Sequence, residues 1–229
     1  MSIPFTLILL AAGSARRMEG AVADKISAPL AGIPVIRHAQ QAFVQAGGLT
    51  RLLVTYRDEV QRLKLEAALG PSAKAEWIKG GDERQNSVLA ALEACEGDGL
   101  VALHDAARPL ILSSSIQKVL QRAQLTGAAI LASRASDTIK LASPSGEKIT
   151  DSPERSHVWM AETPQVFRLS IVREAYRRAA REGQIFTDDA GAVTAAGHDV
   201  TLVEGDGPNL KLTRPSDFTL AEALIKARS

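Results

Sequence analysis

The stretch Leu9-Leu10-Ala11-Ala12-Gly13-Ser14-Ala15-Arg16-Arg17-Met18 decides the fold of this chain. It completes a short apolar run, residues 5–10, which follows Pro4 and predicts a fully buried strand. The small residues beyond the strand let the backbone approach a ligand, and Gly13 can take a positive φ without a Cβ clash. Amide groups exposed in such a turn form an anion-binding concavity, and Arg16 and Arg17 add positive charge. The pattern predicts nucleotide phosphates at the carboxyl end of the first strand of an α/β sheet.

An ordinary strand-to-helix turn with a solvated pair of arginines is the alternative interpretation of this loop. Two known nucleotide motifs are excluded. No Gly-Lys-Ser or Gly-Lys-Thr follows, so this is not a Walker loop. Ala15 and Met18 stand where the dinucleotide-binding fingerprint needs glycines. The nucleotide hypothesis therefore depends on the rest of the chain.

Composition narrows the class of protein. The 229 residues are 45% hydrophobic, which is enough for one α/β core, so we expect a single domain over residues 1–229. The formal net charge of +1 gives no overall basic field and argues against nucleic acid as a partner. Residues 5–10 are too short for a signal peptide or a membrane span, so we expect a cytoplasmic protein. Cys95 is the single cysteine, which fits a reducing compartment, and its Ala-rich helical surroundings predict a small core residue.

Short apolar runs alternate with helical patterns along most of the chain. The predicted strands are residues 5–10, 52–56, 76–78, 100–103, 128–133 and 200–204. The predicted helices are residues 34–46, 58–69 with an apolar face of Val60, Leu63 and Ala67, 84–95, 113–125 with a serine cap, 170–182, a helix capped by Thr187, and a final helix with Pro215 in its first turn. This alternation predicts a doubly wound, mostly parallel sheet.

Right-handed crossovers place the loops that follow parallel strands at one edge of the sheet. The loops that begin at Ala11, Lys79, His104 and Arg134 should therefore meet in one crevice.

The loop after the third strand is Lys79-Gly80-Gly81-Asp82-Glu83-Arg84-Gln85-Asn86-Ser87. Its two glycines permit a tight turn and expose amide groups. Asp82 can accept a hydrogen bond from a base amino group or cap the helix that follows, and capping is the simpler role for an isolated Gly-Gly-Asp. Ser87 lies just inside that helix, close enough to reach a base edge.

The loop after the fourth strand is His104-Asp105-Ala106-Ala107-Arg108-Pro109. Asp105, at the carboxyl end of a strand, suits a ribose hydroxyl or a magnesium ion. Arg108 could form a plain surface ion pair with Asp105, but the two alanines between them favour close ligand approach. His104 is expected to be packed and hydrogen-bonded, because the four histidines (His38, His104, His157 and His198) show no metal-ligand spacing.

The pattern changes over about residues 137–158. Residues 137–141 and 147–150 alternate polar and apolar around Ser143-Pro144-Ser145-Gly146, which predicts a protruding β-hairpin arm. A two-stranded hairpin is marginal alone, so the arm needs a surface to lie on, either in its own domain or on a second subunit.

Taken in order, the motifs resemble one family closely, from near residue 6 to near residue 225. The stretches that carry the resemblance are Ala11-Ala12-Gly13 with Arg17-Met18, Gly80-Gly81-Asp82-Glu83-Arg84 with Ser87, His104-Asp105-Ala106-Ala107-Arg108-Pro109, Asp137-Thr138, Thr163-Pro164-Gln165, Thr187-Asp188, and Asn209-Leu210-Lys211-Leu212-Thr213-Arg214-Pro215. They look like the 2-C-methyl-D-erythritol 4-phosphate cytidylyltransferases of the non-mevalonate isoprenoid pathway. The resemblance implies a Rossmann-like nucleotidyltransferase that uses CTP and magnesium. The substrate phosphate would attack the α-phosphate of CTP in line and release pyrophosphate.

The resemblance also implies a role for each matching residue. The catalytic residues would be Arg17 and Lys25, on the α-phosphate, and Arg155 and Lys211, orienting the incoming phosphate. The CTP-binding residues would be Ala11, Ala12, Gly13, Gly81, Asp82, Ser87, Asp105, Ala106 and Ala107. The substrate-binding residues would be Asp105, Arg108, Thr138, Arg155, Thr163, Thr187 and Lys211. Magnesium is expected mainly on the triphosphate, with the neighbourhood of Asp105 as its candidate site on the protein. The arm of this family crosses to a partner subunit, which implies a homodimer in which Thr138 and Arg155 serve the neighbour's site.

The sequence departs from the family pattern in the loop expected to close over the triphosphate. Ala15 stands where a second glycine is usual, Asp24-Lys25-Ile26 where Pro-Lys-Gln is usual, and the segment between Arg17 and Lys25 has an unusual length. Two alternatives stay open. A cytidylyltransferase for another polyol phosphate, such as ribitol 5-phosphate, would use the same chemistry, and residues 154–165 and Thr187 should discriminate. A non-catalytic nucleotide-binding relative is suggested by the altered loop alone.

Overall fold

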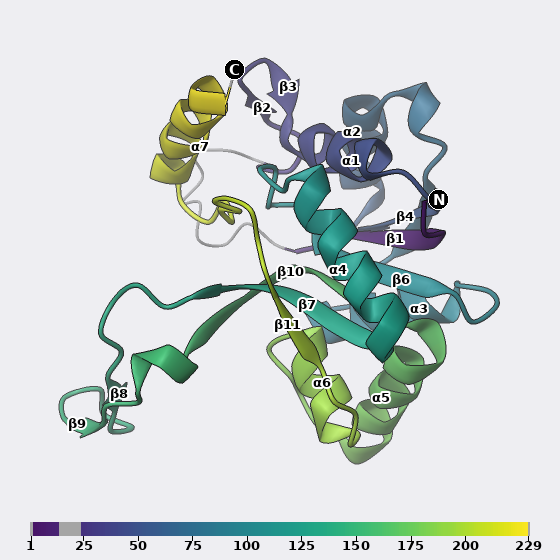
Figure 1. The fold of residues 1–229 in the computed structure, drawn as a ribbon. Coiled ribbons are helices and arrows are strands. Elements are labelled where there is room, and N and C mark those ends of the chain that lie inside the picture. Colours follow the sequence, from purple (N-terminus) through teal and green to yellow (C-terminus); the bar gives the residue numbers. More distant parts are fainter. Residues whose placement is uncertain (1, 14–23, 229) are drawn as a thin grey trace.

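A computed structural model describes residues 2–13 and 24–228, and the centre of this described part is a seven-stranded sheet of order β11-β7-β10-β6-β1-β4-β5 (Figure 1). The strands are β1 (Phe5–Leu10), β4 (Leu49–Tyr56), β5 (Glu76–Lys79), β6 (Leu100–Asp105), β7 (Ala128–Arg134), β10 (Trp159–Arg168) and β11 (Thr201–Glu204). β10 runs antiparallel between β6 and β7, and the other neighbours are parallel. The predicted mostly parallel α/β sheet is confirmed.

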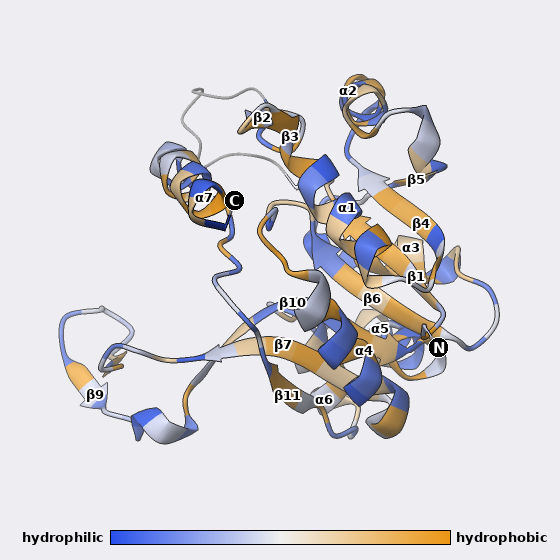
Figure 2. Ribbon diagram, turned by 45° about the horizontal axis from the view of Figure 1, so that its top comes forward, coloured by the Kyte–Doolittle hydropathy of each residue, from blue (hydrophilic) through white to orange (hydrophobic). Residues whose placement is uncertain are grey.

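Helices cover both faces of the sheet. One face carries α1 (Val35–Ala46), α2 (Glu59–Leu69) and α4 (Ser113–Thr126), and the other carries α3 (Arg84–Glu93), α5 (Leu169–Glu182) and α6 (Asp189–Ala195). Leu7 and Leu9 of β1 pack into the first layer, and Ile8 packs into the second. Figure 2 shows the strands in the orange of apolar residues, with blue on the helices around them. Burial on both faces explains why the strands are unbroken apolar runs in the sequence.

β10 is a strand that the sequence pattern did not predict. Its residue Val166 pairs with Ala102 of β6 on one side and with Ala129 of β7 on the other. This insertion separates the carboxyl end of β7 from that of β6. The loop that begins at Arg134 therefore leads into the arm, and the expectation that it joins the shared crevice is wrong.

The arm, residues 135–158, leaves the body of the molecule beside β7 and β10 (Figure 1). Its paired strands, β8 (Leu141–Ala142) and β9 (Ile149–Asp151), are shorter than the predicted hairpin strands. The side chains of Leu141 and Ile149 stay 49% and 66% exposed. Because so short a ladder buries little apolar surface, the arm gains little stability from its own contacts.

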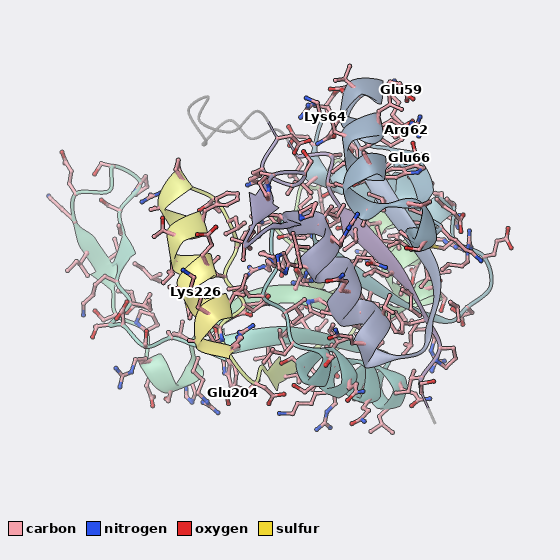
Figure 3. The ribbon with its side chains drawn as sticks, turned by 90° about the horizontal axis from the view of Figure 1, so that it is seen from above. Glu59, Arg62, Lys64, Glu66, Glu204 and Lys226 are labelled. Atoms are coloured by element: carbon pink, nitrogen blue, oxygen red, sulfur yellow. The ribbon has the colours of Figure 1, made fainter. Side chains whose placement is uncertain are left out.

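Helix α2 places its predicted apolar face in solvent. Val60 and Leu63 are 65% and 55% exposed, whereas Gln61 and Leu65 are buried. Gln61 turns inward because its amide side chain binds backbone groups of the neighbouring loops, as described below. Ion pairs from Arg62 to Glu59 and Glu66 lie along the solvent side of the helix (Figure 3).

Two of the predicted helix caps are wrong. Ser113 is the first residue of α4, and Leu112 occupies the cap position without a side-chain hydrogen bond. Asp188 rather than Thr187 caps α6, because its Oδ1 accepts from the amide of Gly191 at 3.0 Å. A carboxylate is among the strongest N-caps, so Asp188 takes the role and leaves the Thr187 side chain exposed.

A separate apolar cluster joins the segment before α1 to the C-terminal part of the chain. Helix α7 (Pro215–Arg228) begins at Pro215 as predicted and packs beside the small hairpin of β2 (Pro29–Leu30) and β3 (Ile33–Pro34) (Figure 1). Leu30, Leu212 and Ala221 are fully buried in this cluster. It brings the segment before α1 next to the segment before α7. In the described part of the chain, no helix has the length and apolar character needed to cross a membrane.

The close packing of Ile3, just before β1, on Gly48 can be tested directly. We expect Gly48→Ala to lower the free energy of unfolding by more than about 3 kcal/mol, because the backbone must shift. Gly48 has φ +86°, and an added Cβ would lie 2.0 Å from the carbonyl oxygen of Ile3. Gly97 is the control, since it has φ +73° but open space around its Cβ position. Gly97→Ala should cost about 1 kcal/mol from backbone strain alone. Equal losses in urea denaturation would contradict the packing argument.

Candidate active site

A cleft of about 460 Å³ opens at the carboxyl edge of β1, β4, β5 and β6. Its lining residues are Leu10, Ala11, Ala12, Gly13, Lys25, Ile26, Thr55, Arg57, Lys79, Gly80, Gly81, Asp82, Glu83, Arg84, Ser87, Asp105, Ala107 and Lys211. The loops after β1, β5 and β6 meet here, as the sequence predicts. Among these described residues five are cationic and three are acidic, so the cleft favours an anionic ligand.

The turn after β1 is held by two buried polar side chains. The hydroxyl of Thr55 accepts from the amides of Ala11 at 3.1 Å and Ala12 at 3.4 Å. Gln61 Nε2 donates to the carbonyl of Ala11 at 3.0 Å, and its Oε1 accepts from the amide of Arg57 at 2.8 Å. Within the turn expected to offer amides to an anion, those of Ala11 and Ala12 are therefore already bonded inside the protein. The sequence pattern did not predict this use of Thr55 and Gln61, because the contacts join separate elements.

The double glycine after β5 allows two loops to approach closely. A Cβ on Gly80 would lie 2.5 Å from Ser87 Oγ and 2.6 Å from the Cβ of Ala12. The amide of Gly80 donates to the carbonyl of Tyr56 at 2.7 Å, and the amide of Gly81 donates to Ser87 Oγ at 3.2 Å. These amides are bonded within the protein, contrary to expectation.

Asp82 does not cap helix α3. The helix begins at Arg84, and Glu83 occupies the cap position without a side-chain hydrogen bond. The side chain of Asp82 is exposed and lines the cleft instead. Its carboxylate is placed to accept a hydrogen bond from a ligand.

Asp105 is the most buried charge in the cleft lining, with 9% of its surface exposed. Burial by itself would raise the pKa of this carboxyl, but Lys211 and Arg84 outweigh it and lower the pKa to about 2. Lys211 Nζ lies 2.6 Å from Oδ2, and Arg84 Nε lies 3.6 Å from Oδ1. Arg108 instead donates to the carbonyl of Asn209 at 2.7 Å. The interpretation of Arg108 and Asp105 as a plain surface ion pair is wrong.

Next to Asp105, a buried chain of hydrogen bonds through His104 and Thr163, here called the relay, holds the loop after β6. His104 Nε2 lies 3.1 Å from the carbonyl of Arg108, an acceptor, so Nε2 carries the hydrogen and Nδ1 is the acceptor. Thr163 then donates its hydroxyl to Nδ1 at 3.1 Å and accepts from the amide of Asp105 at 3.0 Å. Burial lowers the pKa of His104 to about 4, which keeps the ring neutral. His104 is packed and hydrogen-bonded, as predicted, with its ring edge-on to Phe43 at 5.1 Å.

The segment with Lys211 is tied to both neighbouring loops. The amide of Leu212 donates to the carbonyl of Ala107 at 2.8 Å. The carbonyl of Leu212 accepts from Lys25 Nζ at 2.7 Å. Lys25 and Lys211, 186 positions apart in the sequence, therefore both line the same cleft.

A protein-family model, curated relatives and solved structures all match this chain over nearly its whole length. The family model described as IspD, 2-C-methyl-D-erythritol 4-phosphate cytidylyltransferase, matches residues 5–227. The chain belongs to this family. A relative of the same name from Pelotomaculum thermopropionicum is 39% identical over 96% of this chain and 94% of its own length. Another from Bacillus velezensis is 35% identical over 98% of this chain and 97% of its own.

Solved structures of the cytidylyltransferase family share the fold. The crystal structure from Thermus thermophilus has a TM-score of 0.78 and 30% identity, and covers 99% of this chain and 100% of that one. The structure from Francisella tularensis has a TM-score of 0.81 and 26% identity, and covers 96% of this chain and 99% of that one. The predicted family and its nucleotidyltransferase fold are thus confirmed.

The structure brings many of the residues implied by the family resemblance into one cleft. Those in its lining are Ala11, Ala12, Gly13, Lys25, Gly81, Asp82, Ser87, Asp105, Ala107 and Lys211. Ala106 and Thr163 are buried, and the bonded hydroxyl of Thr163 serves the relay beneath Asp105. Arg17 lies outside the described residues.

The other implied residues lie outside the cleft lining of this chain. Thr138 and Thr187 are exposed, and Arg108 is half-buried beside Asn209. Arg155 stands exposed on the arm, with one guanidinium nitrogen 3.0 Å from the carbonyl of Ser136. The cleft lining of one chain therefore does not include Thr138 or Arg155 of its own arm.

The neutral state of His104 gives a pH-dependent stability. The folded pKa of about 4 lies below the ordinary value of 6.5, so between these values the unfolded chain takes up a proton that the folded protein does not. The contribution of His104 to the free energy of unfolding is therefore fully present above pH 6.5. It falls by about 3 kcal/mol as the pH drops to 4. Urea unfolding at pH 7, 6 and 5 should show that His104→Gln is less stable at pH 7 but has a flatter profile.

The control is His157→Gln, because the His157 side chain is 81% exposed. Its profile should parallel that of the unmodified protein. Parallel profiles for the His104 variant and the unmodified protein would contradict the assignment of a buried neutral ring.

Proposed function

We propose that this chain transfers CMP from CTP to 2-C-methyl-D-erythritol 4-phosphate, which gives CDP-linked methylerythritol and pyrophosphate in isoprenoid precursor synthesis. The observation that carries the proposal is the meeting of four motifs in one cationic cleft. The motifs come from residues 11–13, 80–87, 104–109 and 209–215. The names of the full-length relatives support the substrate pair.

The chemistry needs no covalent bond to the protein. An oxygen of the substrate phosphate attacks the α-phosphorus of CTP and forms a new P–O bond. The bond from that phosphorus to the oxygen bridging to the β-phosphate breaks, and its electron pair leaves with pyrophosphate. Catalysis then consists of positioning and fixed positive charge. Arg17 and Lys25 would stabilise the α-phosphate, and Lys211 would orient the incoming phosphate.

The cytosine base of CTP would be recognised by side chains and carbonyls, because the amides of Ala11, Ala12, Gly80 and Gly81 are already bonded within the protein. Cytosine presents an amino group that donates hydrogen bonds, and an aspartate is a suitable acceptor for it. The exposed carboxylate of Asp82 in the cleft is such an acceptor. Ala11, Ala12, Gly13, Gly81 and Ser87 would form the walls around the ring, while Asp105, Ala106 and Ala107 would lie beside the ribose and phosphates.

Magnesium fits this cleft as an ion that arrives on the triphosphate. Across residues 2–13 and 24–228, no cluster of three or more His, Cys, Asp or Glu side chains is arranged to hold a metal. Proteins often bind magnesium through one or two carboxylates together with substrate phosphates, and Asp105 is the candidate here. When bound, magnesium neutralises charge that develops on the phosphates.

The arm suggests a homodimer. Thr138 and Arg155 lie outside the cleft of their own chain, and the arm exposes Leu141 and Ile149. A second copy would cover this apolar surface and receive the two polar side chains near the polyol phosphate, with Arg108 and Thr187 around the polyol. The proposal also includes a cytoplasmic location and no nucleic-acid partner.

Pyrophosphate release tests the function. We expect release with CTP, magnesium and methylerythritol phosphate, and background rates when ATP, GTP or UTP replaces CTP. Ribitol 5-phosphate is the comparison substrate. Release with ribitol phosphate instead would move the assignment to that polyol. CTP binding without release with either substrate would identify a non-catalytic relative.

Two neighbouring arginines provide a matched test of the catalytic assignment. We expect Arg17→Ala to lower turnover by about 10³-fold, because it removes a fixed charge that stabilises the transition state. Arg16→Ala should retain most of the activity, since the family pattern assigns no role to that position. Circular dichroism of both variants checks the fold. Normal turnover of the Arg17 variant would remove this residue from the catalytic set.

A further inference from the structure

The segment that carries Lys211 has no regular secondary structure. Residues 205–214 connect β11 to α7 without forming a helix or a strand (Figure 1). Its backbone has no ladder or helical hydrogen bonds, so its position depends on contacts with other elements. The motif of residues 209–215 begins with Asn209, for which the family resemblance implies no role. Asn209 is nevertheless only 6% exposed.

The side-chain amide of Asn209 binds β10 through two hydrogen bonds. Its Nδ2 donates to Glu162 Oε2 at 2.9 Å and to the carbonyl of Thr163 at 2.8 Å. Glu162 offers a carboxylate, and hydrogen bonds to charged groups are stronger than those between neutral groups. Both acceptors are oxygens, so only the NH₂ end of the amide can face them. Among the described residues Asn209 Oδ1 has no hydrogen-bond partner, so the two bonds of Nδ2 orient this side chain.

The backbone at Asn209 supports two cations that the family resemblance assigns to the polyol phosphate. The carbonyl of Asn209 accepts from Arg108 Nη1 at 2.7 Å. Lys211 follows two positions later, and next to it the amide of Leu212 donates to the carbonyl of Ala107 at 2.8 Å. Lys211 therefore lies between two anchors, one on β10 and one on the loop after β6.

We propose that Asn209 is a positioning residue for the incoming polyol phosphate, because its amide fixes residues 209–211 to β10 and so places Arg108 and Lys211 for binding. This inference rests on the proposed function. Asn209 acts only through these two cations, since both hydrogens of Nδ2 are already bonded to β10. Leucine has a similar shape and would fill the same volume, so packing alone does not require an amide at this position.

Steady-state kinetics of Asn209→Ala test this role. The KM for the polyol phosphate should rise about tenfold or more, because a misplacement of about 1 Å can cost about 10²-fold. The KM for CTP should change less than about twofold, since the proposal gives Asn209 no part in nucleotide binding. Equal rises in the two KM values, or no rise for the polyol phosphate, would overturn the proposal.

Variants of Glu162 give a graded form of the same test, which also serves if Asn209→Ala does not fold. Glu162→Ala leaves Asn209 with the carbonyl of Thr163 alone and should raise the KM for the polyol phosphate about threefold. Glu162→Gln keeps an acceptor oxygen and should raise this KM less than Glu162→Ala does. Asn209→Asp should be the most damaging variant, because a carboxylate has no hydrogen to donate to β10. The reverse order of the two Glu162 variants would contradict the bond.

The matched control removes a side-chain amide bond between two other elements. Gln117 of α4 donates through Nε2 to the carbonyl of Ala46, at the end of α1, at 3.1 Å. Neither residue is among the described residues that line the cleft. Gln117→Ala should leave both KM values within about twofold. A rise in the polyol phosphate KM as large as that of Asn209→Ala would overturn the proposal.

Hydrogen exchange gives a reading that needs no substrate. The amide of Leu212 is bonded to Ala107, so its exchange rate reports whether the segment stays in place. Asn209→Ala should speed this exchange about tenfold or more, while the amides of β6 keep their protection. Unchanged exchange at Leu212 would overturn the proposal. Absence of turnover in the unmodified protein would defeat the proposed function, and hydrogen exchange would still decide whether Asn209 holds the segment.

Discussion

The carboxylate of Asp105 ends β6 with 9% of its surface exposed, and burial of a lone charge at such a place costs several kcal/mol. Lys211 and Arg84 supply the compensating charge from two different parts of the chain. Lys211 comes from the segment before α7, and Arg84 comes from the first turn of α3, where it is itself held by Asp189. Because Asp105 needs both cations, it connects β6 of the central sheet to α3 and to the segment before α7. The same charges give the cleft its preference for anions.

Several backbone amides in the walls of the cleft, among them those of Ala11, Ala12, Gly80 and Gly81, are already hydrogen-bonded within the protein. Thr55 and Gln61 hold the turn after β1, and Ser87 holds the turn after β5. Glycine at position 80 lets these turns touch, since a side chain there would collide with Ala12. These four amides are therefore already occupied by partners inside the protein. Preformed polar groups need little reorganisation when a charged ligand binds.

Tertiary contacts also connect the segments that line the cleft to one another. Leu212 bonds through its amide to the loop after β6 and through its carbonyl to Lys25. The arm is the opposite case, because it leaves the body and exposes apolar side chains on a ladder of a few residues. A cleft built from one chain and an arm that points away from it fit the proposed exchange of arms between two copies.

Much of this protein follows from local sequence. Buried strands appear as apolar runs because they are covered on both faces, and the Ala-Ala-Gly and Gly-Gly-Asp stretches mark loops because small residues permit close approach. The loops after β1, β5 and β6 converge because parallel strands end at one edge. Local pattern could not reveal β10, since the polar stretch Glu162-Thr163-Pro164-Gln165 interrupts its apolar residues and nothing local shows that it inserts between β6 and β7. Nor could it reveal the inward turn of Gln61, the bonded amides of Ala11 and Gly80, or the anchor of Arg84 on Asp189. Each of these depends on a partner far away in the sequence, and a buried polar group is stable only where the tertiary fold brings that partner within hydrogen-bonding distance.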